Sequence, residues 1–382
     1  MTPPSSIFVN SVDPSAIADG ARSLLPTASD MLMVFVAQTD TPELATLIDH
    51  LRPVHSRFLG AVFPALLDGN SRHERGCLII RLPALGEPLV ISAFENTENQ
   101  ITSLGRHLPT GNVAPPTAVI LVDGLAPRVS TVLEATYQYF GDQVHYWGGG
   151  AGRVDGNPSG QPCLFTAGGA FSAGAIIALC PLHAQLGVRH GWTELKGPLI
   201  ATSTEGNVIK QLNWQPALEV YARHVSPELP EPLTWHNFSK HARGFPLGLR
   251  KRGNEFVVRD AIAIDGESAM VCVGDVPENA ALSILRGDAG ALIAAAGEAA
   301  RESRPADDSP GYCCLLSDCI SRTRFLGERF DAELSAINHE LTDTSSGPCP
   351  RGVVTLGEIS SRGDGYLEFF NMTCVVAVLH EY

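Results

Sequence analysis

The stretch MLMVFVAQTDTPELATLIDHLRPV, residues Met31–Val54, decides how the chain begins to fold. Met31–Ala37 is a continuous apolar run, as expected for a strand that is buried on both faces. Thr41 then precedes Pro42 and apolar residues at helical spacing, so we expect a helix that starts at Pro42 with Thr41 as its N-cap. The stretch therefore predicts a buried strand followed directly by a helix.

Outward from this stretch, strands and helices are mixed along the whole chain. Val129–Phe140 has helical periodicity, and Cys77–Leu82 is expected to pair with Leu89–Ala93 through a short turn. The mixture lacks the regular alternation of a parallel doubly wound sheet, so the predicted fold class is mixed α/β (α+β). Further strands are predicted from apolar runs at Thr117–Val122, Gly352–Ile359 and Phe370–Val378.

The length of 382 residues favours two domains. The stretch SPELPEP, Ser226–Pro232, is the richest in proline and is the best candidate for a boundary. We therefore expect two domains built on mixed sheets, residues 1–225 and residues 226–382.

The charge and the apolar pattern exclude several classes of protein. A net charge of −14 repels the phosphates of nucleic acids and anionic lipids, so we expect no nucleic-acid partner. Neither a secretion signal nor an apolar run of membrane-spanning length is found, so a cytoplasmic protein without a membrane segment is expected.

The glycine-rich stretch HYWGGGAGRVDG, His145–Gly156, suggests a phosphate-binding loop at first sight. It lacks the third glycine of a dinucleotide-binding loop and the Gly-Lys-Ser/Thr of a P-loop. Two interpretations remain open. The glycines allow two backbone segments to approach closely, or Gly149 and Gly150 form the wall of a ligand pocket.

Three stretches together resemble the FIST family: RHGWTELKGPLIATSTEGNVIKQLNWQPALEVY (Arg189–Tyr221), CISRTRFLGERFDAELSAI (Cys319–Ile337) and GVVTLGEISSRGDGYLEFFNMT (Gly352–Thr373). No single motif is specific for the family, but the order of the three motifs along the chain is specific for it. The resemblance implies a FIST N domain followed by a FIST C domain, which together sense a small ligand in bacterial signal transduction. Members of the family's haem-binding branch act through a separate histidine kinase or cyclic-di-GMP enzyme, so such a partner is expected here, and a homodimer is one possible oligomeric state.

GAVFP and GGGAG…QPCLF are also similar to the haem-binding branch of the family, which senses nitric oxide. Haem iron needs an axial imidazole, and His190, His145 and His241 lie in or beside the family-like motifs. The motif for covalent attachment, C-x-x-C-H, does not occur, so any haem is expected to be non-covalent haem b. Arg153 is a candidate partner for a haem propionate. For each histidine, the alternative is an ordinary core or surface side chain.

The second ligand hypothesis is an amino acid or a similar metabolite. Glu358 ends an apolar strand and needs a partner, and Arg322 is the candidate. The two side chains are predicted either to form a structural ion pair or to clamp an amino-acid zwitterion. Trp192 and Asn371 are further candidates for the binding site.

No motif of a hydrolase or metalloenzyme is found, so we expect no enzymatic activity. A protein-interaction scaffold without a ligand is the third alternative.

Overall fold

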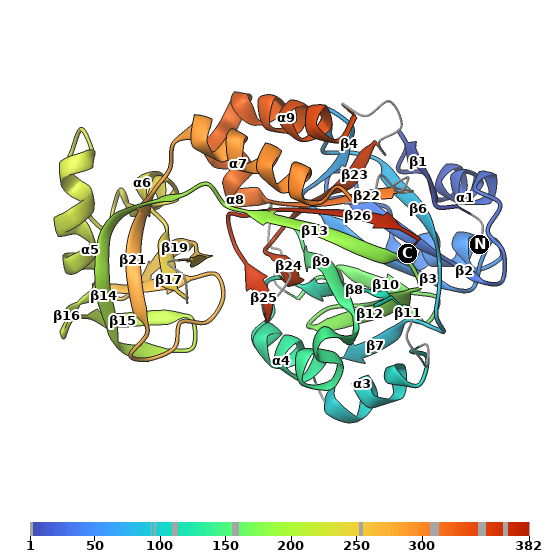
Figure 1. Ribbon diagram of the computed structural model, residues 1–382, viewed down its shortest axis with the longest axis horizontal. Helices are drawn as coiled ribbons and strands as arrows, with labels where there is room; N and C mark the ends of the chain where they lie inside the picture. The colour runs from blue at the N-terminus through green and yellow to red at the C-terminus, as the bar shows by residue number, and fades with distance from the viewer. Residues whose placement is uncertain are drawn as a thin grey trace.

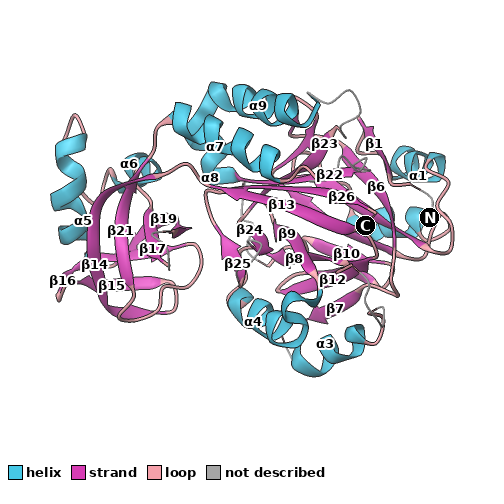
Figure 2. Cartoon of the chain, in the orientation of Figure 1, coloured by secondary structure: helices cyan, strands magenta, loops and turns pink. Residues whose placement is uncertain are grey.

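The computed structural model describes residues 3–92, 94, 97–108, 114–154, 160–251, 255–305, 313–342, 349–361 and 366–381. They form a large body and a small lobe, which are shown at the right and the left of Figures 1 and 2. The small lobe consists of residues 193–288, and the body contains the segments before and after it. The predicted mixed α+β fold class is confirmed. None of the described helices combines the length and the apolarity that a membrane-spanning helix requires.

One pattern occurs three times along the described body: strand, helix, strand, helix, and then four strands. The first repeat contains β1 (Ser5–Val9), α1 (Pro14–Ser23), β2 (Asp30–Ala37), α2 (Leu44–Leu51), β3 (Phe58–Phe63), β4 (Ala65–Asp68), β5 (Ser71–His73) and β6 (Cys77–Pro83). The second contains β7 (Leu89–Ser92), α3 (Thr97–Gly105), β8 (Thr117–Asp123), α4 (Val129–Phe140), β9 (His145–Ala151), β10 (Leu164–Thr166), β11 (Gly169–Phe171) and β12 (Gly174–Cys180).

The third repeat is interrupted by the small lobe, which lies between its first strand and its first helix. Two consecutive helices also replace its second helix. It contains β13 (His183–Arg189), α7 (Ala289–Glu302), β22 (Cys313–Cys319), α8 (Ile320–Leu326), α9 (Phe330–Thr342), β23 (Pro350–Thr355), β24 (Glu358–Ser361), β25 (Leu367–Phe370) and β26 (Cys374–His380).

Each repeat forms one sheet, and another repeat completes it. The second strand of a repeat runs parallel to its third strand and antiparallel to its last, as in β2 with β3 and β6. The third strand then pairs with a hairpin from a different repeat. β10–β11 joins β3, β24–β25 joins β9, and β4–β5 joins β23. Because the third repeat takes its hairpin from the first, the three sheets close into a ring.

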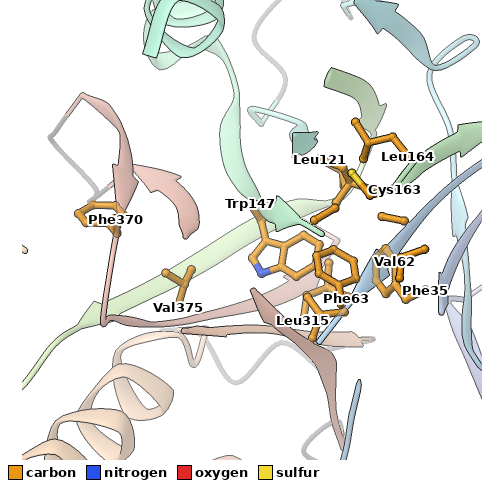
Figure 3. Packing of buried hydrophobic residues seen from close by; sticks show 14 of the residues in the cluster. Phe35, Val62, Phe63, Leu121, Trp147, Cys163, Leu164, Leu315, Phe370 and Val375 are labelled. Carbon is orange, nitrogen blue, oxygen red and sulfur yellow. The ribbon is translucent and has the colours of Figure 1, made fainter. Parts of the chain in front are cut away.

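The inner faces of the three sheets share one apolar core (Figure 3). Phe35 and Phe63 from the first repeat lie beside Trp147 from the second and Leu315 from the third. All four side chains are fully buried. The helices lie outside this ring, where α7 and α9 pack on β22 and β26, and α3 and α4 pack on the sheet of β8 and β12.

The small lobe is a twisted sheet of strands in the order β18-β17-β21-β14-β15-β20-β19, with a short β16 paired to β15. It joins the body through residues 190–192 and 287–288. The boundary predicted between residues 225 and 226 lies inside this lobe, at the end of α5. Its elements are β14 (Thr193–Glu205), β15 (Val208–Leu212), β16 (Gln215–Pro216), α5 (Ala217–Val225), α6 (Phe238–His241), β17 (Leu247–Arg250), β18 (Phe256–Arg259), β19 (Ala261–Asp265), β20 (Ala269–Cys272) and β21 (Ala281–Arg286).

The structure corrects three local predictions. Helix α2 begins at Leu44 rather than at Pro42, because the Thr41 hydroxyl donates to the carbonyls of Ala37 and Gln38 instead of capping the helix. The strands β6 and β7 do not pair with each other, since β6 lies between β1 and β2 while β7 pairs with β12. The predicted strand Gly352–Ile359 is two strands, and the chain crosses from one sheet to the next at Gly357, whose φ is 104°.

Candidate functional site

Within the glycine-rich stretch, residues His145–Ala151 form strand β9 and not a loop, while Asp155 and Gly156 lie outside the described residues. A Cβ atom at Gly149 would lie 2.5 Å from Thr355, and one at Gly150 would lie 2.4 Å from the carbonyl oxygen of Leu356. Gly150 also donates its N–H to the carbonyl of Gly357 at 2.7 Å. The glycines therefore allow the second repeat to approach the third closely, which is the first of the two interpretations that the sequence left open.

The three candidate haem ligands lie in three different places. The His145 ring contacts the His183 ring, with 4.3 Å between their centroids, and burial lowers the pKa of His145 to about 4. His190 accepts the N–H of Trp192 at its Nδ1, at 3.0 Å. His241 lies in the small lobe, 3.2 Å from Glu231.

Arg322 is fully buried in the body and is paired with Glu333 of α9. Its Nε and Nη2 atoms donate to the two carboxylate oxygens at 2.8 and 2.7 Å, and its other donors reach the carbonyls of His190 and Leu292. Asp318 lies 3.8 Å away. Glu333 therefore neutralises Arg322, while burial and Glu333 raise the pKa of the neighbouring Asp318 well above its usual value. Arg322 joins α7, α9 and the start of the interlobe connection. The predicted pairing with Glu358 was wrong.

Glu358 is buried without a cation in hydrogen-bonding contact. It accepts the hydroxyl of Thr355 at 2.7 Å and the N–H of Thr373 at 3.1 Å. Burial raises the pKa of Glu358 to about 8, so the side chain is largely protonated at neutral pH. A protonated Glu358 carries no charge, so it does not need the ion-pair partner that the sequence predicts.

The remaining predicted residues also have structural partners. The Trp192 indole lies at the interlobe connection and donates to the Met372 carbonyl at 2.9 Å. Asn371 is buried and donates its amide to the Phe370 carbonyl. Arg153 donates to the Pro162 carbonyl at 3.0 Å. The predicted residues Trp192, Arg322 and Asn371 thus lie at one end of the third repeat, where they hold the fold together.

A cleft of about 910 Å³ lies between the body and the small lobe. The body contributes the start of α4 and strand β25, and the small lobe contributes residues of β17 to β20 and the turn after β20. All ten residues predicted from the sequence are among the described residues, and none of them lines this cleft. Clefts between domains are a common location for small-ligand sites.

Arg259 stands in the wall of this cleft. Only 7% of its surface is exposed. Its guanidinium donates to the carbonyls of Asp275, Val258 and Phe369 at 2.9, 3.2 and 3.1 Å. Among the described residues it forms no ion pair with a carboxylate. Carbonyls are the printed hydrogen-bond partners of Arg259, and the carboxylates of Glu368 and Asp275 act on its charge without a direct ion pair, so an anionic group of a ligand can still pair with the guanidinium.

Charges of both signs surround Arg259. Lys251 contacts Glu368 at 2.5 Å across the cleft, and the Ser130 hydroxyl donates to Asp275 at 2.5 Å, also across the cleft. The first turn of α4 lines the same cleft and carries neither a side-chain cap nor an acidic residue. Its free N–H groups attract negative charge. The cleft thus offers donors for a carboxylate close to carboxylates that accept from an ammonium group.

The rim of the cleft is apolar and exposed. Leu125, Ile262 and Tyr366 line it, and all three are among the exposed large hydrophobic residues. Cys272 lies deeper, and burial raises the pKa of its thiol to about 12, so it is neutral. Apolar lining residues together with a few placed polar groups are the usual composition of a small-molecule site.

The cleft does not fit the haem that the resemblance implies. Its described lining contains Tyr137, Tyr366 and Cys272 but no histidine. The histidines chosen from the sequence lie away from the cleft.

A ring of three repeats with a separate lobe, and a cleft between them, is typical of a protein that binds a small ligand. The family model of the FIST N domain matches residues 30–215, and that of the FIST C domain matches residues 217–361. The chain belongs to the FIST family, whose domains are small-ligand sensors in signal transduction and are sensory rather than catalytic. No curated protein matches the chain.

Proposed function

We propose that the chain senses a free amino acid or a closely related metabolite, which binds in the cleft between the body and the small lobe. The observation that supports this proposal is the Arg259 guanidinium, which is nearly buried in the cleft wall and lacks a carboxylate partner among the described residues. The ligand's carboxylate accepts from Arg259 and from the first turn of α4. Its ammonium group donates to Glu368 or Asp275.

The same geometry supports a route for the signal. The contacts of Lys251 with Glu368, of Ser130 with Asp275 and of Arg259 with the Phe369 carbonyl all join the two lobes. A ligand that competes for these groups changes the preferred angle between the lobes, which also pack against each other through Val258 and Leu285 of the small lobe. We propose that a separate histidine kinase or cyclic-di-GMP enzyme reads this change.

Thermal shift with a defined panel tests the proposal. The panel contains the twenty common amino acids and their 2-oxo acid analogues at millimolar concentration. We expect at least one amino acid to raise the melting temperature with saturable dependence, and Arg259→Met to abolish the rise, because the carboxylate loses its cationic partner. Arg286→Met, which removes an exposed arginine paired with Glu228, is the matched control and should keep the response. A panel without any effect, or a response that Arg259→Met retains, contradicts the proposal.

Haem with nitric oxide is the second candidate, and it rests on the resemblance to the haem-binding branch. It requires one of His190, His145 or His241 to bind iron. The absorption spectrum after haem addition tests it directly. A Soret band that is lost in one of the three alanine variants supports haem binding, and a spectrum of free haem contradicts it.

A further inference from the structure

A two-residue turn at the outer end of the small lobe carries a strained tryptophan. Asn213 and Trp214 connect β15 to β16, and the flanking residues Leu212 and Gln215 pair with each other. Both turn residues have positive φ, 49° and 60°. Such turns favour Asn followed by Gly, since glycine adopts positive φ without steric conflict and a bulky side chain does not. A tryptophan therefore occupies a position at which the backbone favours glycine.

The turn is held rigidly in this conformation. The Asn213 side chain accepts the N–H of Ile200 at 2.8 Å, and the N–H of Trp214 donates to the Thr202 hydroxyl at 2.8 Å. The indole itself is 77% exposed, whereas Trp147 and Trp192 are buried. Strained backbone that presents a large apolar side chain to solvent points to a binding role for that side chain.

A polar stripe runs along α5 beside the indole. Glu219 and Arg223 lie one helical turn apart on α5, and Gln215 precedes the helix in β16; all three are exposed. Arg223 donates to the Gln215 side chain at 2.8 Å, so the stripe is continuous. We call Trp214 and these three residues the α5 face. An aromatic anchor with a polar rim is the usual anatomy of a protein interface.

The charge of the molecule favours a second copy of this chain on the α5 face. Residues 193–288 contain 12 acidic and 10 basic residues, so the small lobe has little part in the net charge of −14. Two copies therefore repel each other least through this lobe. The α5 face also lies at the end of the lobe that points away from the body (Figure 1).

We propose that two copies of the chain associate through the α5 face around a twofold axis. In an antiparallel contact of two α5 helices, Glu219 of one protomer lies opposite Arg223 of the partner subunit, and the reverse contact forms as well. The face carries one acidic and one basic residue, so it is self-complementary. Each Trp214 indole is covered by the other protomer, which offsets the strain of the turn.

Sedimentation velocity of the full chain between about 1 and 100 µM tests the proposal. We expect the wild type to dimerise and Trp214→Gly to weaken dimerisation at least about tenfold. Because glycine suits this turn, the melting temperature of the monomeric variant stays the same or rises, which separates lost association from unfolding. Trp235→Ala, which removes another exposed tryptophan of the same lobe, is the matched control and should dimerise like the wild type.

A charge swap tests the twofold geometry. Glu219→Arg alone places like charges opposite each other and weakens the dimer, and adding Arg223→Glu restores it. A wild type that stays monomeric over the whole range, or a Trp214→Gly variant that dimerises like the wild type, overturns the proposal. A swap that does not restore association overturns the antiparallel arrangement of α5.

Discussion

The buried arginines Arg322 and Arg259 lie in two regions of the molecule and have opposite surroundings. Arg322 lies inside the third repeat, where Glu333 accepts two of its hydrogen bonds and Asp318 lies nearby. Arg259 lies in the cleft wall, where it meets three carbonyls and no ion-paired carboxylate among the described residues. Arg322 forms a direct ion pair with Glu333 of its own repeat, whereas Arg259 forms no direct ion pair among the described residues and only feels the charges of Glu368 and Asp275 from farther away.

This difference separates a structural arginine from a candidate binding residue. Neutralising Arg322 with acids of the same repeat makes its position independent of any ligand. Arg259 stays charged in the wall of the cleft. A bound anion can therefore form the direct ion pair that Arg259 lacks among the described residues. Substitutions at Arg322, Arg259 and Glu358 test this contrast, from the largest expected effect to the smallest.

Arg322→Met should strongly destabilise the body. The substitution leaves Asp318 and Glu333 buried without a cation, and it removes donors from the carbonyls of His190 and Leu292. Breaking a buried pair on one side costs about 3–5 kcal/mol. Urea unfolding followed by tryptophan fluorescence measures the loss. The double variant Arg322→Met with Glu333→Leu should recover part of it, and a single variant as stable as the wild type would remove Arg322 from its structural role.

Arg259→Met should reduce stability less, by about 1–2 kcal/mol, because only neutral carbonyls lose a donor and no carboxylate is left unpaired. The same urea titration provides the measurement, in the absence of any ligand. A loss as large as that of Arg322→Met would show that Arg259 has the same structural role, and the contrast between the two regions would fail. Arg286→Met removes an exposed ion pair and gives the loss of stability expected for a surface arginine, with which the other two losses are compared.

The local elements could be predicted from the sequence because their signals are local. The apolar run at Met31–Ala37 became β2 with every residue buried, and the periodicity of Val129–Phe140 gave the bounds of α4. The ring could not be predicted in this way. Its closure depends on β4 pairing with β23, strands that lie far apart in the sequence, and no pattern of neighbouring residues encodes that contact.

The candidate site was missed for a related reason. The sequence points to Arg322 because a buried, ionised carboxylate at Glu358 needs a cationic partner. In the structure Glu358 is largely protonated, so it needs no cation. The true partner, Glu333, lies on the next helix and faces Arg322 only after α8 and α9 pack on the sheet. Arg259 follows the apolar residues Val257 and Val258, so a charge at a strand end was a visible signal. The sequence did not reveal that its neighbours are carbonyls.

The smallest effect concerns Glu358, whose pKa is raised by burial from 4.5 to about 8. Between these values the unfolded chain has released the proton while the folded chain keeps it, so stability falls as the pH rises through this window. Glu358→Gln stays uncharged in both states and should show a weaker pH dependence, with a melting temperature about 3–6 °C above the wild type at pH 8 and little difference near pH 5. Differential scanning calorimetry across this range measures it, with the exposed Glu298→Gln as the control. The glutamine side chain can accept the Thr373 N–H with its Oε1 and donate its Nε2 to the Thr355 hydroxyl, so an unchanged pH profile would mean that Glu358 is already ionised. An ionised, buried Glu358 would need a cationic partner. Arg322 does not provide it, because Arg322 is paired with Glu333.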